Sequence, residues 1–274
     1  MELFITLCLP REIRIGSMPD RSPYFPGYDR QGMILTSGES NVGLVRKVNE
    51  DAISLSVPDV YLLADGMGGY DGGQLASRLA VSAAEDFFRR KCEEPVSEAL
   101  MKEAVLAAND AILSEKTKTP ALSSMGTTMV VCAFSEGQVF WAHVGDSRLY
   151  VWQDGSLSQV TVDHSFVMQL VAEGKISKEE MRLHPRKNEI TRAVGIERPL
   201  SVDTGCFPVS KGTLILLCSD GLSGMVEDDT LSRVIGESPR KEQTDLDALG
   251  HRLMELVYAA GARDNVSVIL ALFE

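Results

Sequence analysis

The sequence lacks the features of a disulfide-stabilised, zinc-binding or membrane-spanning protein. Its five cysteines lie far apart, their number is odd, and no two form a C-x-x-C pair. That pattern is typical of reduced thiols in a reducing compartment. The longest apolar run near the start, Leu3 to Leu9, is too short to span a membrane, and no basic segment precedes it. We therefore expect a soluble, cytoplasmic protein with no membrane association.

Basic residues are in short supply. The chain has 27 Lys and Arg residues against 39 Asp and Glu residues, which gives a net charge of −12. Such a surface would repel a nucleic-acid backbone, so we expect no nucleic-acid partner. An anionic substrate would have to find positive charge locally, from a metal ion or a single well-placed arginine.

Two other phosphate-binding signatures are also missing. The glycines from Gly66 to Gly73 fit neither G-x-G-x-x-G nor a P-loop, since no G-K-[ST] follows, so nucleotide binding is unsupported. Cys8 and Arg14 do have the C-x₅-R spacing of a cysteine-dependent phosphatase. The residues between them include no glycine to wrap a phosphate, and Glu12 would repel the anion. We interpret this spacing as chance.

The first 32 residues differ in composition from the rest. They contain four prolines and four arginines without a sustained hydrophobic period. We interpret residues 1–32 as an extended or mobile N-terminal extension. Residues 33–274 are expected to form one catalytic domain, with no internal repeat.

Hydrophobic periodicity predicts alternating clusters of strands and helices after Met33. Strands are expected over 52–57, 61–64, 128–134, 138–144, 148–152, 158–162, 213–218 and 266–273, and helices over 74–90, 97–114 and 246–260. Ser97 is the expected N-cap of the second helix, and Gly261 is the expected glycine after the last. Thr244 and Asp247 have a spacing like that of a capping box. The charge-mixed segment 163–192 has largely helical character, and the order of elements indicates an α+β domain.

Five short segments place an aspartate at or near the end of a strand-like run. They are Asn49-Glu50-Asp51, Ala64-Asp65-Gly66, Val144-Gly145-Asp146-Ser147, Cys218-Ser219-Asp220-Gly221 and Arg263-Asp264-Asn265. Carboxylates at strand ends can converge above a sheet, where they repel one another unless cations lie between them. Oxygen ligands alone suit magnesium, manganese or calcium rather than zinc or copper. Asp-Gly is also common in turns, but five such positions together favour a metal site.

The residues around these aspartates form six motifs. They are Val45-Arg46-Lys47-Val48-Asn49-Glu50-Asp51, Leu63-Ala64-Asp65-Gly66-Met67-Gly68-Gly69, Ser124-Met125-Gly126-Thr127-Thr128, Val144-Gly145-Asp146-Ser147-Arg148, Cys218-Ser219-Asp220-Gly221-Leu222 and Asp264-Asn265-Val266-Ser267. In this order they resemble the motifs of the bacterial branch of the protein phosphatase 2C family, over roughly Thr36 to Phe273. The resemblance implies an α+β fold with four α-β-β-α layers, in which helices flank two antiparallel sheets. It also implies a binuclear metal centre at one end of the sandwich.

The resemblance implies a role for each motif residue. Asp65 resembles the aspartate that bridges both metals, and the Gly66 carbonyl resembles a ligand of one of them. Asp220 and Asp264 resemble the remaining direct ligands.

Further positions complete the implied site. Glu50 and Asp51 would complete the ligand shell directly or through water. Asp146 resembles the carboxylate of a third, weaker metal site. Arg46 resembles the arginine that grips the substrate phosphate, whereas Arg148 is expected to pair within the fold. The implied cofactors are two Mn²⁺ or Mg²⁺ ions, with a third at the weaker site.

Metal chemistry then gives a mechanism. A water bridging two cations about 3.5–4 Å apart becomes a hydroxide at neutral pH and attacks phosphorus in line. The metals and Arg46 would neutralise the equatorial oxygens. The implied substrates are proteins phosphorylated on serine or threonine, including a Ser/Thr kinase whose signalling the enzyme reverses. We expect a monomer.

Several positions depart from the family pattern or are left open by it. Tyr70 stands where histidine is usual, and Gln74 stands where glutamate is common. Met67 follows the Asp-Gly pair, as in bacterial relatives, which leaves the proton donor to the leaving group unassigned. Residues 163–195 resemble the family's flap. His143 is expected in a strand, facing the core or at an edge, and His251 is expected on the surface.

Two alternatives use the same sequence features. One is a catalytically silent relative that binds phosphorylated partners, but such relatives lose metal aspartates, and Asp65, Asp220 and Asp264 are all present. The other is a hydrolase of small phosphate esters with the same site. Kinetics on peptide and small substrates would separate that enzyme from a protein phosphatase.

Overall fold

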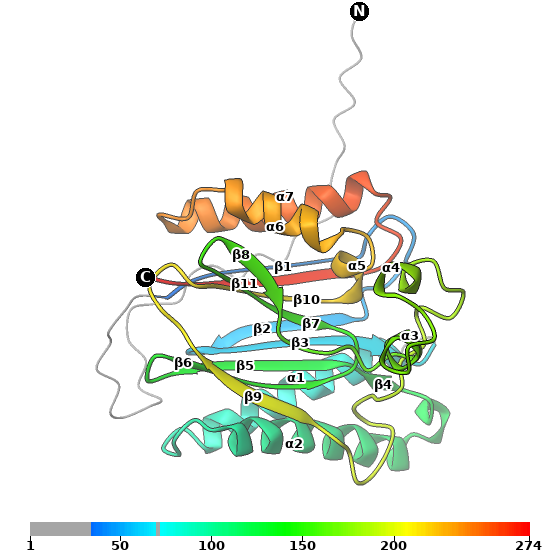
Figure 1. The fold of residues 1–274 in the computed structure, drawn as a ribbon. Coiled ribbons are helices and arrows are strands. Elements are labelled where there is room, and N and C mark those ends of the chain that lie inside the picture. Colours follow the sequence, from blue (N-terminus) through cyan, green and yellow to red (C-terminus); the bar gives the residue numbers. More distant parts are fainter. Residues whose placement is uncertain (1–33, 70–71) are drawn as a thin grey trace, which may run out of the picture.

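Two antiparallel sheets are stacked face to face, and helices cover the outer face of each (Figure 1). The computed structural model describes residues 34–69 and 72–274. The expected four-layer α-β-β-α architecture is therefore confirmed. The predicted extension 1–32, with Cys8 and Arg14, and the departure at Tyr70 lie outside the described residues.

The first sheet has the strand order β1-β11-β10-β7-β8. Its strands are β1 (Ile34–Asn41), β7 (Arg148–Gln153), β8 (Ser156–Gln159), β10 (Leu214–Cys218) and β11 (Val266–Phe273). The strands with the longest apolar runs, β10 and β11, occupy the centre, where both faces are buried. The predicted strand 266–273 is confirmed at both ends, whereas the predicted strand 158–162 is displaced to Ser156–Gln159.

The second sheet has the strand order β2-β3-β5-β6-β9, with β4 paired to β3. Its strands are β2 (Asp51–Val57), β3 (Val60–Met67), β4 (Gly126–Thr127), β5 (Met129–Ser135), β6 (Gln138–Val144) and β9 (Asp203–Pro208). Strand β9 was not predicted, because this short edge strand lacks an apolar alternation. It pairs with β6 so that His143 lies opposite Asp203.

Helices α1 (Gly72–Arg90) and α2 (Glu98–Lys118) cover the second sheet, and α6 (Asp228–Glu237) and α7 (Gln243–Ala259) cover the first (Figure 1). Ser97 caps α2 as predicted, because its side chain accepts a hydrogen bond from the Leu100 N–H at 3.2 Å. Gly261 follows α7 with a φ of +102°, as expected of a terminating glycine. The predicted capping box of α7 is wrong, since its N-cap is Glu242, without a side-chain capping bond.

Three apolar clusters hold the layers together. One lies between α1, α2 and the second sheet, one between α6, α7 and the first sheet, and one between the two sheets. The last includes Leu63, Val130, Leu217 and Ile269, all fully buried. Burial of apolar surface on both faces of each sheet fixes the strand register and hence the positions of the strand ends.

The segment 163–192 contains little helix, contrary to the prediction. Only α3 (Phe166–Ala172) and α4 (Lys178–Met181) form within it, and the rest is turns and loops. The charge-mixed pattern offers few residues for burial, and Val167 is the one buried residue of either helix. A short helix, α5 (Asp220–Ser223), and a 3₁₀ turn at Pro120–Leu122 complete the described elements.

No helix in residues 34–69 and 72–274 is long and apolar enough to cross a membrane.

Candidate metal centre

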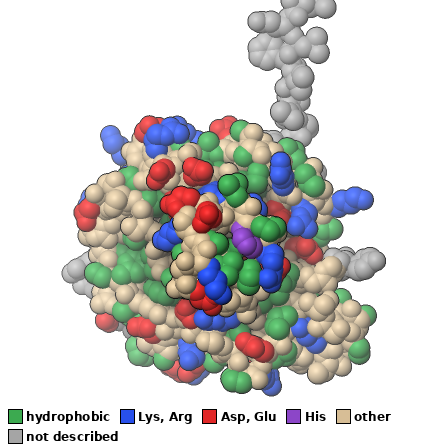
Figure 2. Space-filling model, turned by 45° about the vertical axis from the view of Figure 1, so that its right-hand side comes forward, with side chains coloured by type: hydrophobic (Ala, Val, Ile, Leu, Met, Phe, Trp, Pro, Cys, Tyr) green, Lys and Arg blue, Asp and Glu red, His purple; other side chains and the backbone are tan. Residues whose placement is uncertain are grey.

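The predicted site residues come together at one end of the sandwich. Strands β3, β6 and β10 end there, and β2 and β11 begin there. One pocket at this end is lined by Arg46, Glu50, Asp65, Gly66, Asp146, Asp220 and Asp264. Figure 2 faces this part of the molecule and shows acidic side chains close to basic and hydrophobic ones. Segments separated by as many as 218 residues, Arg46 and Asp264, thus meet at one point.

Pairing between β2 and β3 positions two of the aspartates. Asp51 and Asp65 lie directly opposite each other in the antiparallel register. The Asp65 N–H donates to the Thr128 hydroxyl at 3.0 Å. Asp51 is buried and does not line this pocket but a different one, with Ser40 and Asn49. Its Oδ2 accepts hydrogen bonds from Ser219 at 2.8 Å and Ser267 at 2.7 Å. Asp51 Oδ1 is also buried and has no hydrogen-bond partner among the described residues.

Glycine lets the backbone segments of the site approach closely. A Cβ on Gly66 would lie 2.0 Å from the Gly73 carbonyl oxygen, and one on Gly221 would lie 1.9 Å from the Asn265 carbonyl oxygen. Real side chains do not tolerate such contacts. Asp65-Gly66 and Asp220-Gly221 are therefore packed against the next segment of the site and are not simple turns.

Burial and mutual repulsion act on the aspartates of the site. Burial is the largest cause of a raised pKa in four of them, Asp51, Asp65, Asp146 and Asp220, and neighbouring carboxylates add to it. Together they raise the pKa of Asp51 to about 7, of Asp146 to about 8 and of Asp220 to about 6, and they raise the pKa of Asp65 well above its usual range. Without cations, these buried carboxylates resist ionisation. Bound cations would stabilise their ionised form.

Arg46 and Asp264 form an ion pair, which the sequence did not predict. Arg46 Nη2 lies 2.8 Å from Asp264 Oδ2, and the Asn265 N–H donates to Asp264 Oδ1 at 2.9 Å. The expected phosphate-binding group therefore holds one of the expected metal ligands. Arg46 is half-exposed, so its guanidinium can also be reached from solvent.

Residues that the sequence reasoning did not assign hold the loops of the site. Asn265 accepts a hydrogen bond from the Glu50 N–H at 2.9 Å and donates to the carbonyls of Val42 and Val48, both at 3.0 Å. Gln74, at the start of α1, donates to the Asn49 carbonyl at 3.1 Å and so fixes the same loop. Asn265 lies inside a recognised motif, which is the signal that could have identified it. Asn188 also lines the pocket from the segment 163–195, and no sequence signal pointed to it.

The donors fit hard divalent cations. All are oxygens, and the orphaned Asp51 Oδ1 together with the raised carboxyl pKa values matches a site that is completed by positive charge. As placed in the described ranges, no three His, Cys, Asp or Glu side chains lie close enough together to hold a metal ion. Arg46 engages Asp264 and two hydroxyls engage Asp51, so two of the expected ligands have other partners.

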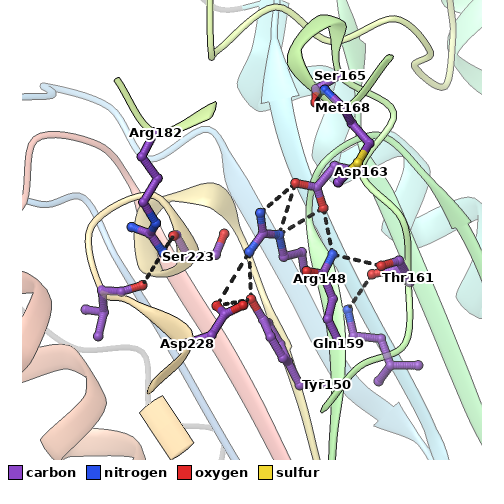
Figure 3. A network of polar contacts seen from close by, with 12 residues as sticks. Arg148, Tyr150, Gln159, Thr161, Asp163, Ser165, Met168, Arg182, Ser223 and Asp228 are labelled. Atoms are coloured by element: carbon purple, nitrogen blue, oxygen red, sulfur yellow. Dashed lines mark hydrogen bonds and ion pairs between the residues drawn. The ribbon is translucent and has the colours of Figure 1, made fainter. Parts of the chain in front are cut away.

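Arg148 pairs within the fold, as predicted. Its guanidinium lies 2.6 Å from Asp163 Oδ2 and donates to the Tyr150 hydroxyl at 2.7 Å, and Tyr150 donates to Asp228 at 2.9 Å (Figure 3). Arg182 donates to the carbonyls of Ser223 and Val226, both at 3.1 Å. These bonds anchor the segment 163–195 to the first sheet and to the turn after α5.

Two of the histidines lie as the sequence indicated. His143 is fully buried in β6, and burial lowers its pKa to about 3. His251 is partly exposed on α7.

Comparisons with known proteins agree with this geometry. A family model described as protein phosphatase 2C matches residues 45–256. The serine/threonine protein phosphatase PstP of Mycobacterium tuberculosis is 37% identical over 240 residues, which cover 86% of this chain and 44% of PstP. The chain thus spans less than half the length of that relative. The serine/threonine phosphatase stp of Listeria monocytogenes is 32% identical over 243 residues, which cover 88% of this chain and 92% of stp.

Solved structures show the same likeness. The crystal structure of the PstP catalytic domain in complex with two manganese ions is 35% identical to this chain, with a TM-score of 0.78. The match covers 88% of this chain and 98% of that structure. The order of the motifs, the two-sheet fold, the family model and these relatives lead to one conclusion: the chain belongs to the protein phosphatase 2C family.

Proposed function

We propose that this protein is a metal-dependent phosphatase that hydrolyses phosphoserine and phosphothreonine in proteins. One observation carries the proposal. Carboxylates from five separate segments face or back a single pocket at one end of the sandwich, and an arginine stands at its rim. An anionic substrate can bind to such an acidic pocket only if cations supply the missing positive charge.

The ligands follow from these positions. We assign the Asp65 carboxylate, the Gly66 carbonyl, Asp220 and Asp264 to the principal metal site, with Asp51 behind it. Asp146 is assigned to a third, weaker site. Asp51 Oδ1, buried and without a hydrogen-bond partner among the described residues, supports its place in the ligand shell. The preferred ions are Mn²⁺ or Mg²⁺, since every donor is oxygen.

The chain's own groups then bind and orient the substrate. When bound, the cations acidify water and stabilise the charge that develops on phosphoryl oxygens. We expect Asp264 to release Arg46 when it takes a ligand position, so that the guanidinium can make two charge-assisted hydrogen bonds to the substrate phosphate. The close backbone approaches at Gly66 and Gly221 hold the aspartates in place without a side chain that would block the pocket.

We also propose the domain limits, the flap, the substrates, the cellular location and the oligomeric state. Residues 33–274 form the catalytic domain, and the segment 163–195 acts as a flap, since Asn188 and Ile190 line the pocket. The substrates include a Ser/Thr kinase whose signalling the enzyme reverses. We infer a cytoplasmic monomer, and we expect that removal of residues 1–32 leaves turnover within a few-fold of the full chain.

A phosphopeptide assay tests the proposal. Purified full-length protein is stripped with a chelator and assayed with phosphothreonine and phosphotyrosine peptides of one sequence, with and without added Mn²⁺ or Mg²⁺. Activity that appears only with metal, and on the phosphothreonine peptide, is expected. Full activity in metal-free buffer, verified by elemental analysis, or no activity with any metal, would contradict it.

A further inference from the structure

One buried histidine joins the base of the flap to the loop that carries Asp146. His164 is 5% exposed and follows Asp163, the first residue of the flap. Its backbone N–H donates to the Gly145 carbonyl at 2.7 Å, and its carbonyl accepts from the Thr191 N–H, also at 2.7 Å. His164, at the start of the flap, therefore contacts the returning end of the flap and also the residue before Asp146.

The side chain of His164 makes a second contact with the same glycine. The Gly145 N–H donates to His164 Nδ1 at 3.1 Å. Because a backbone N–H can only donate, Nδ1 must be unprotonated, and the ring proton of the neutral imidazole lies on Nε2. His164 Nε2 lies 3.0 Å from Asp203 Oδ2 and donates to it. One tautomer thus satisfies both bonds.

Asp203 fixes the other side of the imidazole and the far end of the flap. It begins β9, directly opposite His143 of β6, and its Oδ1 accepts from Arg192 at 2.8 Å. Arg192 lies where the flap returns to the body of the domain. One carboxylate thus holds His164 at the start of the flap and Arg192 at its end.

The backbone at Gly145 is tightly bent. Its φ is +112°, and a Cβ there would lie 2.6 Å from the Thr128 side chain, so the loop is tightly bent at this position. The Thr128 and Ser147 hydroxyls share a hydrogen bond of 2.7 Å on the other side of the loop. Asp146 lies between these two anchored residues, Gly145 and Ser147.

We propose that His164 is a positioning residue: in its Nε2-protonated form it locks Gly145 through Nδ1, and so sets both the direction of the Asp146 carboxylate and the base of the flap. The role assigned to Asp146 rests on the proposed function, whereas the lock itself does not. The essential feature of His164 is then a hydrogen-bond acceptor for the Gly145 N–H at the position of Nδ1. The ring volume and the bond to Asp203 are secondary.

Two substitutions separate these possibilities. In His164→Asn the amide oxygen replaces Nδ1 as an acceptor for the Gly145 N–H, and the donor to Asp203 is lost. In His164→Gln the amide reaches the place of Nε2 and keeps the donor to Asp203, and the acceptor for Gly145 is lost. Both remove the ring, so a purely packing role would affect them alike. His251→Gln, on the partly exposed face of α7, is the matched control.

The lock is tested first without metal or substrate. Nitrogen NMR of the full-length protein should show His164 Nδ1 unprotonated and Nε2 protonated. Amide hydrogen exchange at Gly145 should be slow in wild type, His164→Asn and His251→Gln, and at least tenfold faster in His164→Gln. Equal protection in Asn and Gln variants, or an Nδ1-protonated ring, would overturn the proposal.

The consequence for the site is tested by Mn²⁺ titration and phosphopeptide kinetics. Loss of a group that orients a metal ligand typically costs about 10–100-fold in affinity. We expect the weakest Mn²⁺ site to lose about that much in His164→Gln, with a rise in KM larger than the fall in kcat. His164→Asn and His251→Gln should stay within about threefold of wild type. If both His164 variants lose Mn²⁺ affinity equally, the acceptor role is wrong. If wild type itself neither binds metal nor turns over, the proposed function fails, while the NMR and exchange results still decide the lock.

Discussion

The two ends of the sandwich use the same dipeptide for different reasons. At the end opposite the metal centre, Asp154-Gly155 joins β7 to β8, with φ values of +54° and +79° and nothing within 4 Å of a Cβ on Gly155. This pair forms a hairpin turn that requires positive φ at both residues. At the metal end, Gly66 and Gly221 lack positive φ, but a Cβ on either would strike backbone at 2.0 Å or less.

Asp-Gly therefore has two structural roles in this chain, and the packing around the glycine distinguishes them. Where the glycine is open to solvent, the aspartate is a turn residue. Where the glycine is pressed against another segment, the aspartate faces a pocket shared with other carboxylates. Matched substitutions at the two ends of the sandwich test this difference.

The largest difference is expected for the aspartates. Asp65→Asn should lower kcat/KM by about a thousandfold or more, because it weakens the group that would hold both metals. Asp154→Asn should leave activity unchanged, because Asn-Gly suits the same turn. Phosphopeptide kinetics and calorimetric Mn²⁺ titration on both variants provide the measurement. Equal losses, or an active Asp65→Asn enzyme, would contradict the assignment.

The glycines give the next largest difference. In Gly221→Ala the new Cβ would lie 1.9 Å from the Asn265 carbonyl oxygen, so the backbone must move. We expect a loss of about 3 kcal/mol in unfolding free energy. Gly155→Ala meets no atom and should cost only about 1 kcal/mol for its positive φ. Urea unfolding of both variants tests this, and a ranking in the reverse order would show that close approach does not matter at the metal end.

Within the metal end, a substitution of Arg46 separates substrate binding from metal binding. Arg46→Ala should lower kcat/KM on the order of 100-fold through loss of a charge-assisted phosphate contact. Metal affinity should stay near wild type or rise slightly, because Asp264 is released from its ion pair. Arg233→Ala, on the solvent-exposed face of α6, serves as control. Normal kinetics, or loss of the metals, would remove Arg46 from the substrate site.

The smallest expected effect is a pH dependence confined to the metal end. Folding raises the pKa of Asp51, Asp146 and Asp220 to about 7, 8 and 6. The folded state therefore binds more protons than the unfolded state between about pH 4 and 8, and metal-free stability falls as pH rises through that window.

We expect the metal-free protein to be more stable at pH 5.5 than at pH 8. Saturating Mn²⁺ should stabilise the protein more at pH 8, where the ligands are ionised. Asp146→Asn should reduce the dependence. Thermal unfolding with chelator and with Mn²⁺ at both pH values checks this. Metal-free stability that rises with pH would contradict it.

The elements that could be predicted from the sequence are those whose local hydrophobic pattern agrees with their packing in the fold. Strand β11 is a nearly continuous apolar run and Ser97 is a typical N-cap residue, so the limits of β11 and the start of α2 were predicted closely. The strand-end aspartates were found because their motifs occur in a specific order. Sequence could not show that they reach one pocket, since that depends on the packing of both sheets.

Other features depend on contacts across the fold. Strand β9 has little apolar pattern of its own and forms because β6 offers an edge. The segment 163–192 has a helix-like charge pattern but buries too little to form long helices. The Arg46–Asp264 pair and the bonds of His164 to Gly145 and Asp203 join residues far apart in the chain, and no local pattern predicts them.

The central claim is that the carboxylates at one end of the sandwich hold divalent cations. Anomalous diffraction from crystals grown with Mn²⁺ tests it most directly. The account predicts at least two strong manganese peaks within about 2–2.5 Å of oxygens from Asp65, Gly66, Asp220 or Asp264. It also predicts that Arg46 has turned away from Asp264. Manganese bound elsewhere, or none at this pocket while Arg46 still pairs with Asp264, would contradict it.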